Sequence, residues 1–92
     1  MDEGHYKLRL FVSGMSVKSI HAINNLKKIC EEHLGNDFDI QIMDINTEPE
    51  MAVKYQIFAI PTLITSSAFG SRMIVGDLSD TKKVLAILNI SE

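Results

Sequence analysis

Several residue types that mark common classes of small protein are scarce in this sequence. It has one cysteine in 92 residues, so no internal disulfide can stabilise the fold, which favours a reducing, cytoplasmic setting. No apolar run approaches the roughly 18 residues of a membrane span, and the start of the chain shows no charged-then-apolar leader. Acidic residues (12) outnumber lysine and arginine (9), which argues against nucleic-acid binding. We therefore expect a cytoplasmic protein that binds neither membrane nor nucleic acid.

Hydrophobic periodicity divides the chain into seven elements. A length of 92 residues leaves no room for a second core, so we expect one domain, 1–92. The predicted elements are a strand at 6–13, a helix at 17–34, a strand at 38–45, a helix at 49–56, strands at 62–65 and 72–75, and a last helix with Val84, Leu85, Ile87 and Leu88 on its apolar face. The order β-α-β-α-β-β-α predicts an α/β, thioredoxin-like fold with a four-stranded mixed sheet and helices on both faces.

Glycine and proline mark the turns of this fold. Gly14 ends the first strand, while Gly76 and Asp77 close the fourth strand before the last helix, which we expect the 76–80 segment to cap. Pro61 opens the third strand, since proline disfavours helix in the residue before it. Ile-Pro-Thr-Leu at 60–63 is similar to the cis-proline corner of thioredoxin-like domains; the alternative is a proline that simply starts a strand.

The sequence has no recognisable catalytic centre. Thioredoxin-like redox enzymes carry Cys-x-x-Cys or Cys-x-x-Ser before the first helix, where 14–19 here has no cysteine. Ser16 or Ser19 could steady a bound thiolate, but Ser16 is better explained as a helix N-cap. Cys30 lies on the apolar stripe of the helix and is expected to be a small buried hydrophobe. The histidines do not converge on a metal, and Asp44 is one acid without a partner, so we expect no enzyme, no metal and no cofactor.

Several segments in order along the chain resemble the KaiB family of clock proteins. They are Tyr-Lys-Leu-Arg-Leu-Phe-Val-Ser-Gly at 6–14, Ile-Met-Asp-Ile at 42–45, Ile-Phe-Ala-Ile-Pro-Thr-Leu at 57–63, and Arg-Met-Ile-Val-Gly-Asp-Leu-Ser at 72–79 followed by Lys-Val-Leu at 83–85. Pro-Thr-Leu is common among thioredoxin-like chains, whereas Gly-Asp-Leu-Ser followed by Lys-Val-Leu is specific.

The resemblance implies a non-enzymatic, protein-binding regulator. KaiB proteins dock on the ring-shaped ATPase KaiC, capture KaiA and so time KaiC phosphorylation; the same fold is the sensor domain of a clock-output histidine kinase. The implied partner is a KaiC-like ATPase, with a histidine kinase or a KaiA-like protein as further candidates, in a clock or in stress adaptation. Family members also form a tetramer with the order β-α-β-β-α-α-β, so this second fold and a dimer or tetramer are open alternatives.

Four positions depart from the family pattern. Ile87 and Asn89 replace the glycine and aspartate of a Gly-Leu-Asp segment in the last helix. Glycine costs about 1 kcal/mol in a helix interior, and a negative charge is disfavoured at a helix C-terminus. Both changes therefore favour the thioredoxin-like order. Gln41 and Gln56 stand where clock members carry lysine, which favours a KaiC-linked regulator that works without KaiA.

We expect the partner-binding surface around the second strand and the second helix. Its candidate residues are Gln41, Met43, Met51, Lys54, Tyr55 and Gln56. An alternative is that Met51 and Tyr55 are core residues. Exposed apolar residues such as Phe58 or Phe69 could also pair two copies of the chain.

A second functional hypothesis is a thioredoxin-like module that binds glutathione or another small ligand without redox activity. It would use the backbone of Ile60 before Pro61 and helix caps at Ser16 and Ser79, and it rests on fold analogy alone.

Overall fold

The predicted order of elements is confirmed. The computed structural model describes residues 6–68 and 70–88. Its elements are β1 (Tyr6–Val12), α1 (Val17–His33), β2 (Phe38–Asp44), α2 (Pro49–Lys54), β3 (Thr62–Ser67), β4 (Gly70–Val75) and α3 (Thr81–Ile87). Residues 81–87 are helical, as the thioredoxin-like order requires, whereas the alternative order would make the last segment a strand. Asn89 lies outside the described residues.

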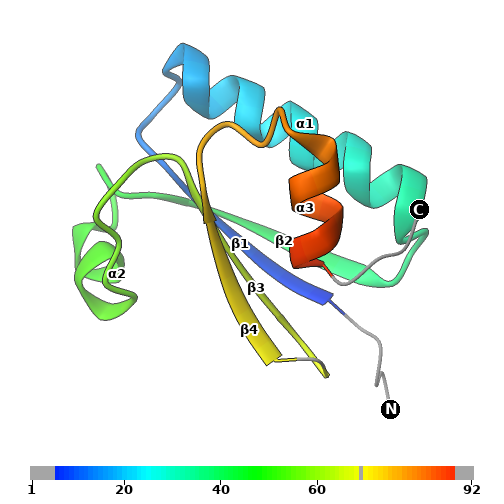
Figure 1. Ribbon diagram of the computed structural model, residues 1–92. Coiled ribbons are helices and arrows are strands. Elements are labelled where there is room, and N and C mark those ends of the chain that lie inside the picture. The colour runs from blue at the N-terminus through cyan, green and yellow to red at the C-terminus, as the bar shows by residue number, and fades with distance from the viewer. Residues whose placement is uncertain (1–5, 69, 89–92) are drawn as a thin grey trace.

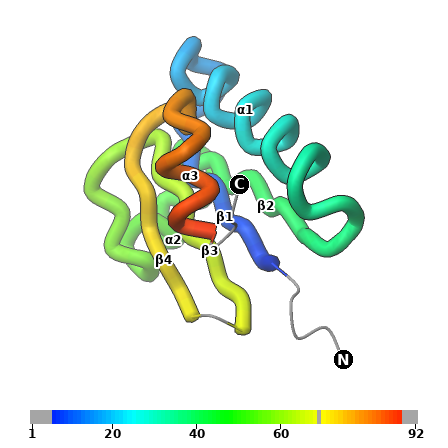
Figure 2. The backbone as a smooth tube through the Cα atoms, turned by 45° about the vertical axis from the view of Figure 1, so that its right-hand side comes forward, coloured from blue at the N-terminus to red at the C-terminus, as the bar shows by residue number. Residues whose placement is uncertain are grey.

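The strands form one mixed sheet in the order β2-β1-β3-β4. β1 and β2 are parallel, and the pairs β1–β3 and β3–β4 are antiparallel. α1 and α3 lie on one face of the sheet, and the short α2 lies apart from them, at the other face (Figures 1 and 2). The sheet therefore has two unequal faces, one covered by two helices and one covered by a single short helix.

Alternation along β1 directs side chains to both faces. Leu8, Leu10 and Val12 are buried and belong to one hydrophobic cluster with residues of α1 and α3, such as Leu26 and Leu85. The buried residues of that cluster are Tyr6, Leu8, Leu10, Val12, Ala22, Leu26, Ile29, Cys30, Leu63, Ile74, Leu78, Val84, Leu85 and Leu88. The main core therefore lies between the sheet and the α1/α3 layer.

The hydroxyl of Tyr6 ties the end of α3 to the sheet. It donates a buried hydrogen bond of 2.8 Å to the carbonyl oxygen of Leu88. This carbonyl belongs to the C-cap of α3, where intrahelical partners run out. Burial, followed by the nearby charge of Asp37, raises the pKa of Tyr6 above its usual value, so the phenol stays protonated as a donor.

Polar caps begin the two helices of the main layer. The Ser16 hydroxyl accepts a hydrogen bond from the Ser19 N–H at 3.3 Å, which confirms the predicted N-cap of α1. The N-cap of α3 is Asp80, whose carboxylate accepts from the Lys83 N–H at 3.2 Å. The cap expected at Ser79 is therefore wrong by one residue. Ser79 donates its N–H to the Asp77 carboxylate instead, at 3.1 Å.

Three predicted boundaries differ from the structure by two residues, and the predicted ends of β1, α1 and β2 differ by one. α2 ends at Lys54 rather than at residue 56, because Gln56 has a positive φ of 56° that cannot continue a right-handed helix. β3 runs on to Ser67 and β4 begins at Gly70, so the expected turn at 66–70 is shorter. Phe69, expected to be an exposed apolar residue, lies outside the described residues.

Of the two alternatives for Pro61, the structure has the cis-proline corner. The Ile60–Pro61 bond is cis, and Pro61 is buried. The Gly76 N–H donates to the Pro61 carbonyl oxygen at 2.9 Å, which joins the start of β3 to the end of β4. Gly76 has a φ of 122°, a conformation that side-chain-bearing residues rarely adopt.

Candidate partner-binding surface

Asp44 fixes the loop that carries α2. Its carboxylate oxygen Oδ1 accepts hydrogen bonds from the N–H groups of Gly14 at 3.1 Å and Asn46 at 2.9 Å. Gly14 follows β1 and has a φ of 57°, which favours glycine. The Asn46 side chain also donates to the Ser13 hydroxyl at 3.3 Å. Asp44 is therefore a structural carboxylate that holds the turn before α2 against the end of β1.

An aromatic pair links the chain directly after α2 to the sheet. The rings of Tyr55, which directly follows the helix, and Phe11 of β1 have their centroids 5.5 Å apart at an interplanar angle of 53°. Phe11 is fully buried, whereas Tyr55 is half-buried and no residue of α2 itself is buried. Met51 is also half-buried. Tyr55 therefore combines the two alternatives weighed for it, with its ring against Phe11 and part of its surface accessible.

Two cationic side chains approach the ring of Tyr55. The Arg9 guanidinium carbon lies 5.4 Å from the ring centroid, and the Lys54 ammonium nitrogen lies 5.5 Å from it. Both distances are within the roughly 6 Å over which a ring face attracts a cation. Arg9 was not among the candidate residues. The alternation along β1 indicated which face of the sheet Arg9 occupies. Only the fold shows that Tyr55 lies against Arg9 on that face.

The other predicted residues are distributed around this contact. Gln41 is exposed and lies opposite Arg9 in the β1–β2 register. Met43 lies opposite Phe11 and is only 4% exposed, so it supports the surface from below and offers little area to a partner. Gln56 is exposed beyond α2. The structure thus brings Gln41, Lys54 and Tyr55 together around Arg9.

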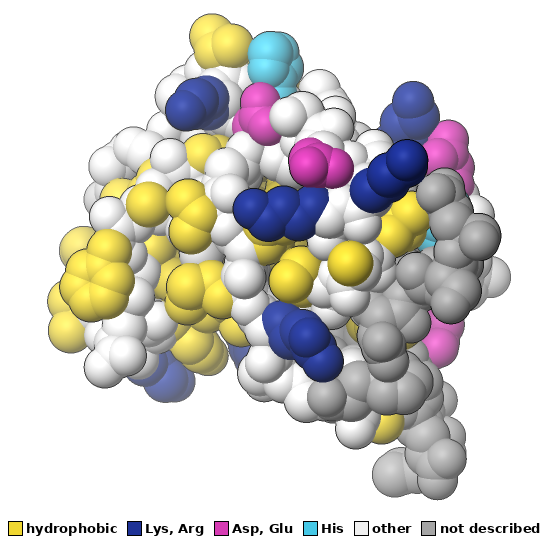
Figure 3. Space-filling view, viewed as in Figure 1, with side chains coloured by type: hydrophobic (Ala, Val, Ile, Leu, Met, Phe, Trp, Pro, Cys, Tyr) yellow, Lys and Arg dark blue, Asp and Glu magenta, His cyan; other side chains and the backbone are white. Residues whose placement is uncertain are grey.

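Large apolar side chains are exposed beside this contact. Phe58 is 95% exposed, Val53 79% and Val75 55%. Hydrophobic side chains gather on the left of Figure 3, over α2 and the segment after it. An exposed apolar group of this kind, next to polar and cationic residues, is typical of a surface that contacts another protein.

The residues at the usual redox position serve in helix capping. The Ser16 hydroxyl donates to the Ser19 hydroxyl at 2.8 Å, and the Ser13 N–H donates to the Ser19 hydroxyl at 3.2 Å. Cys30 is fully buried, and burial, followed by the charge of Glu31, raises the pKa of its thiol to about 12. Of the two caps that the glutathione-binding hypothesis would use, Ser16 does cap α1, whereas α3 is capped by Asp80 and not by Ser79.

Asp77 organises the loop between β4 and α3. Hydrogen bonds from the Ser79 side chain and backbone lower the pKa of its carboxyl group. The Asp77 carbonyl oxygen accepts from the Asn25 side chain at 2.8 Å, which joins this loop to α1. Asp77 therefore joins the loop between β4 and α3 to α1.

Residues 6–68 and 70–88 contain neither a metal-binding group of side chains nor a membrane-spanning helix. No three histidine, cysteine, aspartate or glutamate side chains in these ranges are grouped closely enough to hold a metal ion. No helix within them is long and apolar enough to cross a membrane.

Sequence comparison identifies the family. The KaiB domain model matches residues 9–90. The chain belongs to the KaiB family. It is 40% identical over 90 residues to circadian clock protein KaiB3 of Synechocystis, covering 98% of this chain and 88% of that protein. It is 35% identical over 85 residues to circadian clock oscillator protein KaiB of Synechococcus elongatus, covering 92% of this chain and 83% of that one.

Solved structures confirm the thioredoxin-like fold of this KaiB-family chain. The N-terminal domain of SasA from Synechococcus elongatus aligns with a TM-score of 0.75 at 21% identity, covering 96% of this chain and 87% of that chain. Thioredoxin from Fasciola hepatica aligns with a TM-score of 0.75 at 16% identity, covering 98% of this chain and 85% of that chain. At these identities the likeness shows the fold alone.

Proposed function

We propose that this protein is a non-enzymatic, single-domain regulator that docks on a KaiC-type ATPase and modulates its phosphorylation or signalling, in a clock or in stress adaptation. The observation that carries the proposal is the exposed contact on the α2 side of the sheet, where Arg9, Tyr55 and Lys54 meet beside Gln41. The names of the relatives, circadian clock proteins, support the clock branch of this proposal.

The geometry supports docking rather than chemistry. A docking surface needs accessible side chains held in fixed positions, which the Tyr55–Phe11 stack and the Asp44 hydrogen bonds supply. Candidate contacts are Gln41, Met51, Lys54, Tyr55 and Gln56, with Met43 beneath them. Further partners under the same proposal are a histidine kinase, a KaiA-like protein and a second copy of this chain.

A binding measurement tests the proposal. The protein is mixed with a purified KaiC-type ATPase with and without ATP, and complex formation is followed by analytical ultracentrifugation while ATPase phosphorylation is assayed in parallel. We expect a complex and an altered phosphorylation time course. Tyr55→Ala should weaken the complex by about 10-fold or more, as expected of a central aromatic contact.

The control variant is His21→Ala, an exposed change on α1, which should bind like the wild type. If no complex forms either with or without ATP, the proposal is refuted. Equal binding by wild type and Tyr55→Ala would move the contact away from the α2 side.

A further inference from the structure

The α2 side of the sheet collects cations, although the chain as a whole is acidic. Its formal net charge is −3. Lys7 and Arg9 alternate with core residues along β1 and extend on the side away from α1 and α3, and Lys54 ends α2 on that same side. We call Lys7, Arg9, Lys54 and Tyr55 the cationic surface. Its positive charge is a local feature and does not follow from overall composition.

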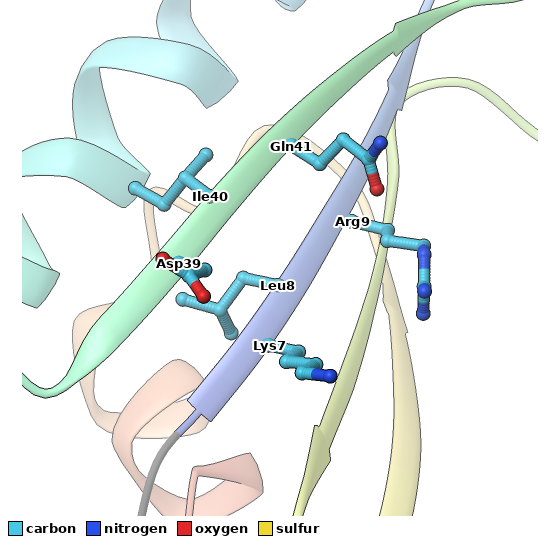
Figure 4. A pocket seen from close by; sticks show the side chains of 6 residues that line it. All are labelled: Lys7, Leu8, Arg9, Asp39, Ile40 and Gln41. Atoms are coloured by element: carbon cyan, nitrogen blue, oxygen red, sulfur yellow. The ribbon is translucent and has the colours of Figure 1, made fainter.

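A groove runs along this surface between β1 and β2. It has a volume of about 390 Å³ and is lined by Lys7, Leu8, Arg9, Asp39, Ile40 and Gln41. In Figure 4 the side chains of Lys7, Arg9 and Gln41 extend to one side of the strands, and Ile40 extends to the other, toward the helices. The groove is open and follows two neighbouring strands, a shape that suits an extended segment better than a compact ligand.

The contact with Tyr55 prepares Arg9 for a carboxylate. A guanidinium near a ring is restrained by the aromatic surface, while its N–H groups point outward in the guanidinium plane. Those N–H groups form the fork that pairs with both oxygens of a carboxylate. Lys54 approaches the same ring, so a second positive charge lies within 5.5 Å of the Tyr55 ring centroid.

We propose that the cationic surface binds an acidic, extended segment of a partner protein. The proposal deepens the docking function proposed above by stating the chemistry of the partner. Carboxylates of the segment pair with Arg9, Lys54 and Lys7, and its apolar side chains lie against the exposed Val53 and Phe58 near α2. Asp39, on the β2 side of the groove, opposes Lys7 in the strand register and limits how many negative charges the groove accepts.

The test uses a peptide and so does not depend on the ATPase. The probe is a fluorescein-labelled peptide of about ten residues that alternates glutamate with leucine and serine, measured by fluorescence anisotropy with the full chain. We expect binding that weakens at least about 5-fold between about 50 and 250 mM salt, because screening weakens exposed charge pairs. A peptide with lysine in place of glutamate should not bind.

Two charge-matched double variants locate the site. Lys7→Glu with Lys54→Glu changes the cationic surface, and Lys27→Glu with Lys28→Glu changes exposed residues of α1 on the opposite side of the sheet. Both double variants lower the net charge of the protein by the same amount. We expect the first pair to weaken peptide binding by about 10-fold or more and the second by less than about 2-fold. Asp39→Asn should strengthen binding by about 2-fold.

Arg9→Lys tests the role of the guanidinium. It keeps the charge and loses the planar fork, so binding should weaken by roughly 3-fold, less than in the double variant. Backbone amide shifts on peptide addition should centre on β1, the start of β2 and the end of α2.

Several outcomes overturn the proposal. They are no peptide binding, equal losses in the two double variants, or amide shifts centred on α1. Binding to vesicles of equal parts phosphatidylglycerol and phosphatidylcholine, without peptide binding, would replace it with a membrane-surface role.

If the peptide binds as described and a KaiC-type ATPase does not, the docking function fails and this proposal stands. If the ATPase binds equally to both double variants, this proposal fails and the docking function stands.

Discussion

The two faces of the sheet differ in what covers them. On the α1/α3 face, Leu8, Leu10 and Leu63 are almost fully buried beneath two helices. On the α2 face, the helix has no buried residue, and Met73 and Val75 of β4 stay about half exposed. Burial of apolar area is the main source of folding free energy. The α1/α3 face therefore stabilises the fold, and the α2 face is available for binding.

The largest expected effect separates the two faces by stability. Leu26→Ala on α1 removes a fully buried side chain and should lower the free energy of unfolding by about 2–5 kcal/mol. Val53→Ala on α2, where the side chain is 79% exposed, should change it by about 0.5 kcal/mol or less. Urea unfolding followed by circular dichroism measures both. Similar losses in the two variants would show that α2 is part of the core.

Removing one tyrosine hydroxyl group on each side compares the two faces a second time. Tyr6→Phe deletes the buried donor to the Leu88 carbonyl and should cost about 1–2 kcal/mol, because that acceptor loses its partner. Tyr55→Phe, on the α2 face, is the matched control and should cost about 0.5 kcal/mol or less. The same unfolding measurement applies. A neutral Tyr6→Phe would mean that the bond does not hold α3 to the sheet.

Thiol chemistry distinguishes the faces by access. Cys30 lies on the buried face of α1 and its thiol pKa is raised to about 12, so iodoacetamide at pH 8 should modify the native protein about 100-fold more slowly than the urea-unfolded protein. A cysteine at the exposed position of Val53, introduced by Val53→Cys with Cys30→Ala, should react rapidly in the native protein. Mass spectrometry follows both rates. Equal rates would contradict the burial of Cys30.

The smallest expected effect is on the pH dependence of stability, through Asp77 in the loop between β4 and α3. The pKa of Asp77 is lowered on folding, so its carboxylate stabilises the fold above the unfolded pKa of about 3.9, and this contribution disappears as pH falls through the lower folded value. Asp77→Asn should therefore flatten slightly the fall of thermal stability below about pH 4. The effect is small because the group is accessible to solvent. A steeper fall in the variant would reverse the assigned sign.

The main layer could be predicted from sequence because its signals are local. The alternation of 6–13 and the apolar stripe of 17–34 specify faces without knowledge of the fold. Ser16 as a cap and Cys30 as a buried residue follow from the same patterns, and both are confirmed. The same patterns give the order of the elements, and the Ile-Pro-Thr-Leu segment at 60–63 indicates the corner at Pro61.

The candidate surface was only partly predictable because it depends on contacts between distant segments. Tyr55 and Lys54 are visible as residues of a short helix, but the approach of Tyr55 to Arg9 depends on where the helix ends and how the chain turns at Gln56. A positive φ at a glutamine has no reliable sequence signal. For the same reason, Met43 could not be recognised as support beneath the surface rather than as a contact.

Hydrogen exchange of the protein with and without a KaiC-type ATPase shows which face of the sheet docks. If the α2 side is the docking surface, amides in β2, α2 and the segment at 55–60 should be protected in the complex, while the exposed face of α1 exchanges as in the free protein. Protection confined to α1 and α3, or identical exchange in both samples, would contradict the assignment of docking to the α2 face and of folding stability to the α1/α3 face.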